Sequence, residues 1–217
     1  RVTFYGLENI PTIFRGTLRR PGFCRAWDVF VKLGMTDDSY QLEGVSDMTH
    51  RSFINTFLAY NENDSVELKL MHYLQIPQDS ELMEKLEWLG IFEETPVGLD
   101  EATPAQVLQK ILEKKWAMKP EDKDMIVMWH KFGFSLNGED KMIESHMVRK
   151  GKNAEDTAMA ETVGLPVGIA TRMILQEIIT TPGVHIPITK EIYEPILAEL
   201  AEEGITFTER EVPYKGY

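Results

Sequence analysis

The stretch RGTLRRPGFCRAW at residues 15–27 carries the signals around which we interpret the rest of the chain. Residues 12–19 mix β-branched and aromatic side chains and contain no proline, a composition that predicts a strand. Because side chains alternate along a strand, Arg15, Thr17 and Arg19 would share one face. Two arginines and a hydroxyl group on one face could hold an anion, whereas the plain alternative is a solvated strand face.

A helix is expected directly after this strand. Apolar residues recur at helical spacing between Phe23 and Val31, and Gly34 would end the helix. Cys24 lies between Phe23 and Trp27, which favours a packed structural thiol. A nucleophilic cysteine would need an activating base, and the sequence pairs Cys24 with none.

The totals limit the class of partner. The 217 residues carry 35 acidic and 23 basic side chains, a net charge of −12, which speaks against binding nucleic acid or an anionic membrane. The single cysteine excludes an internal disulfide and fits a reducing compartment. We see no secretory signal and no run of about eighteen apolar residues, so we expect a cytoplasmic protein without a membrane partner.

The sequence contains neither of the two common phosphate-binding loop motifs. Neither G-x-G-x-x-G nor G-x-x-x-x-G-K-[ST] occurs in the sequence. The chain opens on Arg1 in the middle of a pattern and looks like part of a longer protein. If that protein transfers hydride, we expect its nucleotide-binding Rossmann domain to lie outside this chain.

Residues 36–122 carry amphipathic patterns without strand patterns, which predicts an all-helical insertion. Its clearest helix begins with a capping box of Thr103 and Gln106, with Pro104 at the first helical position. Methionine and aromatic side chains here are interpreted as core. The other helices are expected at residues 47–58, at residues 65–74 and after the capping residue Ser80.

Asn137-Gly138 is the strongest short hairpin signal that a sequence can carry. It lies between strand-like runs at residues 125–136 and 139–149. If these two residues form the loop, the register follows outward from it. The expected pairs are Leu136 with Glu139, Phe134 with Lys141, Phe132 with Ile143, Lys131 with Glu144, and Met128 with Met147.

The same register bears on a metal site. His130 and His146, with Glu144 nearby, resemble the beginning of a zinc site. The two histidines fall on opposite faces of the predicted hairpin, so they cannot share an ion, and we expect no metal. Paired carboxylates for acid–base chemistry cannot be identified, and the catalytic residues stay unknown.

The remaining elements complete the predicted fold class, which is α+β. We expect a mixed, largely antiparallel sheet flanked by helices, with residues 1–35 and 123–217 as one domain and residues 36–122 as the helical insertion. Small side chains would let two C-terminal helices approach a sheet or another subunit closely, and Gly164-Leu165-Pro166 would break or kink the pair. The remaining elements are expected as helices at 156–163, 166–178 and 195–203 and as strands at 2–5, 184–186 and 205–212.

Three stretches resemble a known family in the family's order: RGTLRRPGFCRAWDVFVKLG at 15–34, TAMAETVGLPVGIATRMIL at 157–175 and GVHIPITKEIYEPILAEL at 183–200. They resemble saccharopine reductase, the glutamate-forming saccharopine dehydrogenase of lysine metabolism. The resemblance implies the substrate-binding and dimerisation region of a homodimeric enzyme. The parent enzyme would condense glutamate with aminoadipate semialdehyde and reduce the imine, or run the reverse oxidation. NADP or NAD would be bound mainly by the absent domain, and both the cofactor and the direction stay open.

The resemblance also implies that the segment at residues 15–19 contributes to the substrate site. Arg15 is the first choice and Arg19 the second, with Thr17 beside them and Gly16 allowing close approach. In a strand the two arginines would lie about 13 Å apart, at roughly 3.3 Å per residue. They would therefore hold separate carboxylates of a long ligand, and saccharopine has three carboxylates.

Near the C-terminus the family uses a Thr-Arg-Gly turn to bind substrate, and this chain has Thr181-Pro182-Gly183 there. Thr181 is kept as a site residue, but the arginine is missing. Thr180 or His185 could replace it, or the substrate could differ from saccharopine. Two alternatives stay open: a non-catalytic oligomerisation module, and the same region of a dehydrogenase that acts on another amino-acid imine.

Overall fold

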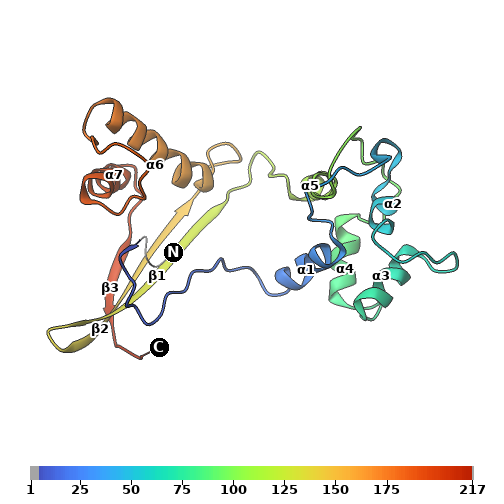
Figure 1. Ribbon diagram of the computed structural model, residues 1–217, viewed down its shortest axis with the longest axis horizontal. Helices are drawn as coiled ribbons and strands as arrows, with labels where there is room; N and C mark the ends of the chain where they lie inside the picture. The colour runs from blue at the N-terminus through green and yellow to red at the C-terminus, as the bar shows by residue number, and fades with distance from the viewer. Residues whose placement is uncertain (1–4, 217) are drawn as a thin grey trace. The chain divides into compact units, whose positions relative to one another are not determined.

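The computed structural model describes residues 5–216, which contain seven α-helices, one 3-10 helix and three strands (Figure 1). The chain divides into two compact units, and each is described by itself. The helical unit is Arg15–Ala117. The sheet unit comprises the described residues of Arg1–Phe14 and Met118–Tyr217. Helices and an antiparallel sheet together confirm the predicted α+β class.

The helical unit forms where the caps and stripes of the sequence predict it. Ser65, Ser80 and Thr103 each accept a hydrogen bond from the backbone at the start of a helix, and the capping box of Thr103 and Gln106 is present. Gly34 ends the first helix in the left-handed conformation. The elements are α1 Phe23–Leu33, η2 Val45–Asp47, α2 His50–Asn55, α3 Val66–Leu74, α4 Glu81–Leu89 and α5 Pro104–Trp116.

One continuous apolar core holds the helical unit together. Phe53, Leu70 and Ile111 are each 0% exposed in it. Helix α1 contributes Phe30, which is 2% exposed, and packs near α4 inside this unit. The predicted domain boundary places the α1 residues in the sheet domain. The domain boundaries stay a prediction, but the buried face of α1 belongs to the helical core.

The strand predicted at residues 12–19 is wrong. This segment forms no strand and pairs with none of the described strands. Its residues are exposed, and Phe14 and Leu18 reach 91% and 96% exposure. β-branched composition favours a strand only where a neighbour accepts its hydrogen bonds and its apolar face is covered. The expected common face of Arg15, Thr17 and Arg19 therefore has no structural basis.

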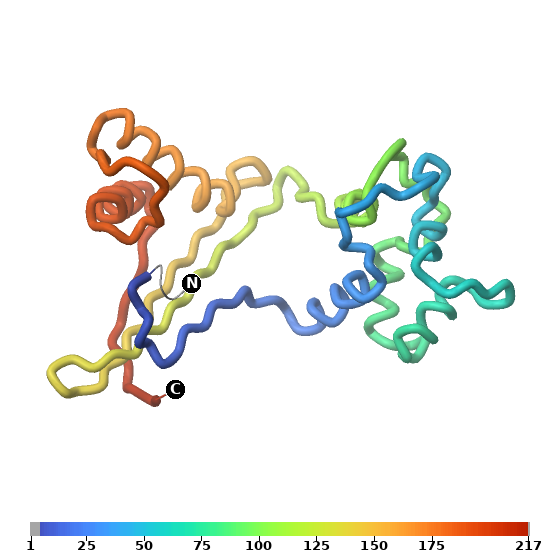
Figure 2. The backbone as a smooth tube through the Cα atoms, viewed as in Figure 1, coloured from blue at the N-terminus to red at the C-terminus, as the bar shows by residue number. Residues whose placement is uncertain are grey.

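The sheet contains β1 Met125–Leu136, β2 Glu139–Lys150 and β3 Thr208–Val212 in the order β1-β2-β3. Both pairings are antiparallel, so within the described residues the sheet is not mixed. All five predicted hairpin pairs are confirmed. Asn137 and Gly138 have φ of 55° and 82°, the left-handed pair that a two-residue hairpin turn requires. Figure 2 shows the two long strands of this hairpin running side by side.

Two helices accompany the sheet, α6 Ala158–Leu175 and α7 Lys190–Glu202. They pack together through a small core that includes Ile169, Met173 and Leu200. The predicted break at Pro166 is wrong, because α6 continues through it as one helix. The strand predicted at residues 2–5 lies outside the described residues except for Tyr5, which is not in a strand. Residues 184–186 form no strand either.

The length of α6 bears on the expected absence of a membrane partner. Its 18 residues have a mean hydropathy of 1.2 and are 17% buried, so by length and composition alone this helix could cross a membrane. It carries Glu161 and Arg172, which form ion pairs with Arg149 and Glu199 of the same unit. Charged groups are costly in a bilayer, and these pairs favour a helix that packs in the protein.

Candidate functional site

The predicted arginine segment is an exposed stretch of backbone at the beginning of the helical unit. Arg15, Gly16, Thr17 and Arg19 are all exposed. The Arg19 guanidinium donates to the preceding carbonyl oxygen at 3.2 Å and lies 5.6 Å from the ring centre of Phe23. This cation–π contact holds Arg19 at the N-terminal end of α1.

This stretch concentrates positive charge. Arg20 and Arg25 extend the set that Arg15 and Arg19 begin, and among the described residues none of the four forms an ion pair with a carboxylate. The protein as a whole carries a net charge of −12. The charge of Arg25 contributes to the lowered pKa of Glu81, so this arginine already attracts a carboxylate. The other three arginines are available to a small anion, which arginine can bind with two parallel hydrogen bonds.

The Thr181 turn lies in the sheet unit and is held by a carboxylate that the sequence interpretation missed. Glu191, in the first turn of α7, accepts from the backbone amides of Thr180 and Thr181 at 2.7 and 3.2 Å. It also accepts from the hydroxyl group of Thr180 at 3.2 Å and from that of Thr181 at 2.5 Å. These four bonds fix the turn to the beginning of α7.

The same contacts determine the charge of Glu191. Its pKa is lowered to about 2, first by the Thr181 hydroxyl group and then by the Thr180 amide. Hydrogen bonds to the ionised form favour that form, so the carboxylate is negative at neutral pH. Glutamate is favoured in the first turn of a helix, but nothing in the sequence pairs Glu191 with the threonines ten and eleven residues before it.

The residues proposed to replace the missing arginine have other roles. Thr180 is bonded to Glu191, as described above, and His185 Nε2 lies 2.6 Å from the carbonyl oxygen of Pro182. The structure therefore assembles the turn from Thr180 to His185 as a local unit within the sheet unit. The arginine segment belongs to the helical unit, so the predicted site residues fall into two groups.

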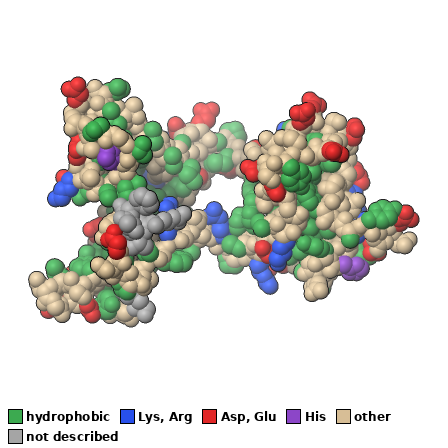
Figure 3. Space-filling model, viewed as in Figure 1, with side chains coloured by type: hydrophobic (Ala, Val, Ile, Leu, Met, Phe, Trp, Pro, Cys, Tyr) green, Lys and Arg blue, Asp and Glu red, His purple; other side chains and the backbone are tan. Residues whose placement is uncertain are grey.

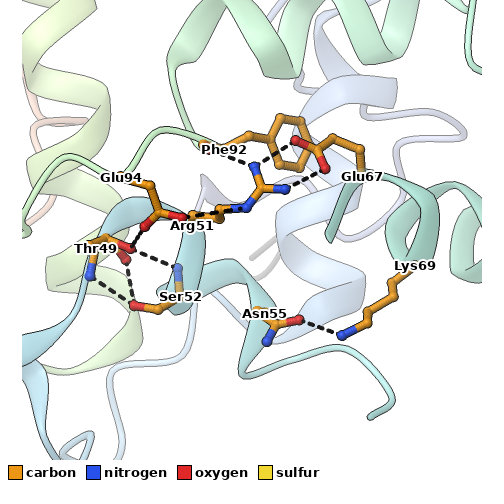
Figure 4. Close-up of polar contacts among 8 residues, drawn as sticks. All are labelled: Thr49, Arg51, Ser52, Asn55, Glu67, Lys69, Phe92 and Glu94. Carbon is orange, nitrogen blue, oxygen red and sulfur yellow. Dashed lines mark hydrogen bonds and ion pairs between the residues drawn. The ribbon is translucent and has the colours of Figure 1, made fainter. Parts of the chain in front are cut away.

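A second polar cluster, in the helical unit, links helices and a loop to one another (Figure 4). Arg51 donates two hydrogen bonds of 2.7 Å to the Glu67 carboxylate and one of 2.9 Å to the Phe92 carbonyl oxygen. The hydrogen bond to Arg51 is the main reason that the pKa of Glu67 is lowered. Thr49 donates to Glu94 at 2.9 Å. These bonds join the start of α2 to α3 and to the loop after α4.

An apolar groove of about 500 Å³ opens between α1 and α5 in the helical unit. Trp27 and Trp116 line it and stack with ring centres 6.2 Å apart. Glu113 is the charged residue of its lining. None of the predicted site residues lines this groove, so it is separate from the arginine segment.

Metal and thiol chemistry find little support in the described residues. Within residues 5–216 no group of three or more His, Cys, Asp or Glu side chains could hold a metal ion. The register pairs His130 with Ser145 and His146 with Trp129, so the histidines face opposite sides of the hairpin as predicted. Cys24 is exposed, and the expectation of a packed thiol is wrong because the buried face of α1 lies on the side of Phe30.

A family model described as the saccharopine dehydrogenase C-terminal domain matches residues 2–205. The chain is 36% identical over 210 residues to the mitochondrial alpha-aminoadipic semialdehyde synthase of Rattus norvegicus, covering 94% of the chain and 22% of that protein. It is 30% identical to the NADP(+), L-glutamate-forming saccharopine dehydrogenases of Schizosaccharomyces pombe and Saccharomyces cerevisiae. Those matches cover 94% and 96% of the chain, and 47% and 48% of the yeast proteins.

Proposed function

Because this chain belongs to the saccharopine dehydrogenase C-terminal domain family, we propose that it is the substrate-binding and dimerisation region of a glutamate-forming saccharopine dehydrogenase. The chain spans about half the length of the yeast relatives, 47% and 48%, so the activity belongs to a longer parent enzyme. The observation that carries the proposal is the set of exposed arginines at residues 15–20, which form no ion pair among the described residues.

In the helical unit, Arg15 and Arg19 would bind substrate carboxylates, with Gly16 and Thr17 beside them. In the sheet unit, Thr181 at the turn is a separate substrate-binding candidate. Their role would be to orient the substrate so that the imine carbon meets the hydride donor, which is catalysis by positioning. The names of the yeast relatives include NADP(+), which favours NADP over NAD for the parent enzyme. No G-x-G-x-x-G sequence is present to hold a dinucleotide, so we assign no residue of this chain to the cofactor.

Dimerisation would use the outward face of α6. Met159, Val163, Val167 and Ile174 lie on one side of this helix and are 55–63% exposed. A β-carbon added at Gly164 or Gly168 would meet nothing within 4 Å, so a partner could approach closely. Apolar side chains also reach the surface of the hairpin (Figure 3). Exposed apolar faces of this kind mark interaction surfaces.

The same face supports the alternative of a non-catalytic oligomerisation module. Light scattering after gel filtration distinguishes a dimer from a monomer, and Val167→Glu should shift the mass toward the monomer. Retained dimerisation with no effect of any arginine variant on substrate binding would favour the module. We also propose a cytoplasmic location; the rat relative is named as mitochondrial, and cell fractionation decides between the two.

The decisive experiment uses the complete parent enzyme and follows nucleotide absorbance with saccharopine. Arg15→Ala should raise the KM for saccharopine at least tenfold while the KM for NADP stays unchanged, because the variant loses a carboxylate contact. Lys110 on α5 is exposed and forms no ion pair among the described residues, so Lys110→Ala is the matched control. Equal kinetics for both variants would remove the arginine segment from the site. A folded, nucleotide-binding enzyme that ignores saccharopine would instead point to another amino-acid imine.

A further inference from the structure

Thr180 and Thr181 have no hydrogen-bond donors left for a carboxylate. Thr180 and Thr181 together offer four donors, two amides and two hydroxyl groups, and Glu191 accepts from all four. A threonine hydroxyl group has one hydrogen to donate and two lone pairs that accept. With its hydrogen directed to Glu191, the Thr181 oxygen can only accept from a ligand.

The charge at the turn points in the same direction. Glu191 carries a full negative charge at neutral pH, since its pKa is lowered to about 2. Among the described residues it forms no ion pair that would neutralise it. Lys190, the neighbouring cation, lies 3.6 Å from Glu194 instead. A ligand therefore meets acceptor lone pairs beside a negative charge, which repels a carboxylate and attracts an ammonium group.

Pro182, in place of the arginine of the family's Thr-Arg-Gly turn, changes which ligand group the turn can bind. Pro182 contributes no amide donor and no positive charge, and its carbonyl oxygen is already contacted by His185 Nε2 at 2.6 Å. A turn with an arginine would present a cation to the substrate. This turn presents Thr181 as an acceptor, held in place by Glu191.

We infer that the Thr180–Thr181 turn recognises the ammonium group of an amino-acid substrate and that Glu191 is the positioning residue that sets this preference. The inference rests on the proposed function, which places Thr181 in the substrate site. Saccharopine has a primary ammonium group besides its three carboxylates, so the proposed substrate carries the group that this turn would bind.

The test compares two substrates with the complete parent enzyme: saccharopine, and saccharopine in which hydrogen replaces the primary amino group. Glu191→Gln should raise the KM for saccharopine about tenfold or more, with kcat little changed. The KM for the deamino analogue should stay the same, because that analogue lacks the primary ammonium group that the turn would bind. Glu194→Gln, on the same helix, is the matched control and should change neither value.

A second set of variants separates positioning from loss of structure. Thr181→Val should reproduce the effect of Glu191→Gln, and the double variant should be no worse than Thr181→Val alone, because Glu191 acts through Thr181. Glu191→Asp keeps the charge and should recover part of the affinity. If Glu191→Gln affects both substrates equally, or neither, the inference is overturned. If the wild-type enzyme does not turn over saccharopine at all, the proposed function fails first, which is a different result.

Discussion

Gly151 is the position where the smallest substitution should do the greatest local damage. Its amide donates to the Asp124 carbonyl oxygen at 3.0 Å, and the Asp124 carboxylate accepts from the amides of Ala158 and Met159 at 2.6 and 2.8 Å. Asp124 thus ties the base of the hairpin to the N-terminus of α6. A β-carbon at Gly151 would lie 2.2 Å from Asp124 Oδ1, 2.8 Å from Ala158 N and 3.0 Å from Thr157 Cα.

The size of the effect follows from these distances. Ordinary contact begins near 3.4 Å, so in Gly151→Ala the carboxylate must move by more than 1 Å and release its two amide hydrogen bonds. Losing a cap at a helix N-terminus costs about 1 kcal/mol, and leaving an unpaired donor about 1–3 kcal/mol. We expect a loss of about 2–4 kcal/mol. For a domain of roughly 100 residues, that loss lowers Tm by about 10–20 °C.

Hydrogen exchange with mass spectrometry measures the effect in the sheet unit alone, through the peptides of α6. Gly164→Ala is the matched control: its β-carbon meets nothing within 4 Å, so the change should be neutral or stabilise α6 by about 0.5–1 kcal/mol. Protection of α6 should fall in Gly151→Ala and hold in Gly164→Ala. If both variants keep wild-type protection and melting, the proposed role of Asp124 as the link to α6 is refuted.

Two further predictions concern the helical unit. The pKa of Glu67 is lowered from 4.5, chiefly by its hydrogen bond with Arg51, so its stabilising contribution is present above pH 4.5 and is lost as the pH falls through the lower folded-state value. Glu67→Gln should therefore lower the free energy of unfolding at pH 7, and this free energy should fall less steeply below pH 4.5 than in the wild type. Urea unfolding at pH 7, 4.5 and 3 measures this difference. If the free energies of the variant and the wild type run parallel over this pH range, the prediction is contradicted. Ile111 is 0% exposed, so Ile111→Ala should cost about 2–5 kcal/mol, measured by tryptophan fluorescence in guanidinium. Lys110→Ala on the same helix should cost almost nothing, and equal losses would disprove the packing argument.

Short-range chemistry explains which elements could be predicted from the sequence. Asn137-Gly138 fixes a two-residue loop, and a two-residue loop leaves one register, so five strand pairs followed from two residues. Thr103, Gln106 and Pro104 likewise set the start of α5 through contacts three residues apart. In each case the partners are close in the chain, so the pattern contains the whole interaction.

The failures share the opposite cause. Residues 12–19 have strand composition, but a strand also needs a neighbour, and the described sheet provides none for them. Pro166 removes one backbone donor from α6, but packing of Ile169 and Met173 against α7 holds the helix together across it. Composition indicates what a segment prefers, whereas its surroundings decide whether that preference is realised.

The residues of the candidate site also differ in whether the sequence could identify them. Arg15, Arg19 and Thr181 could be named from the sequence, because motifs resembling a family surround them. Glu191 could not, since its role arises from donors ten and eleven residues away that the turn brings back to the start of α7. The sequence by itself determined the family, the hairpin register and the helix caps. Only the tertiary structure decided which donors are already occupied, because each N–H or O–H hydrogen is directed to one acceptor and proximity in space selects it.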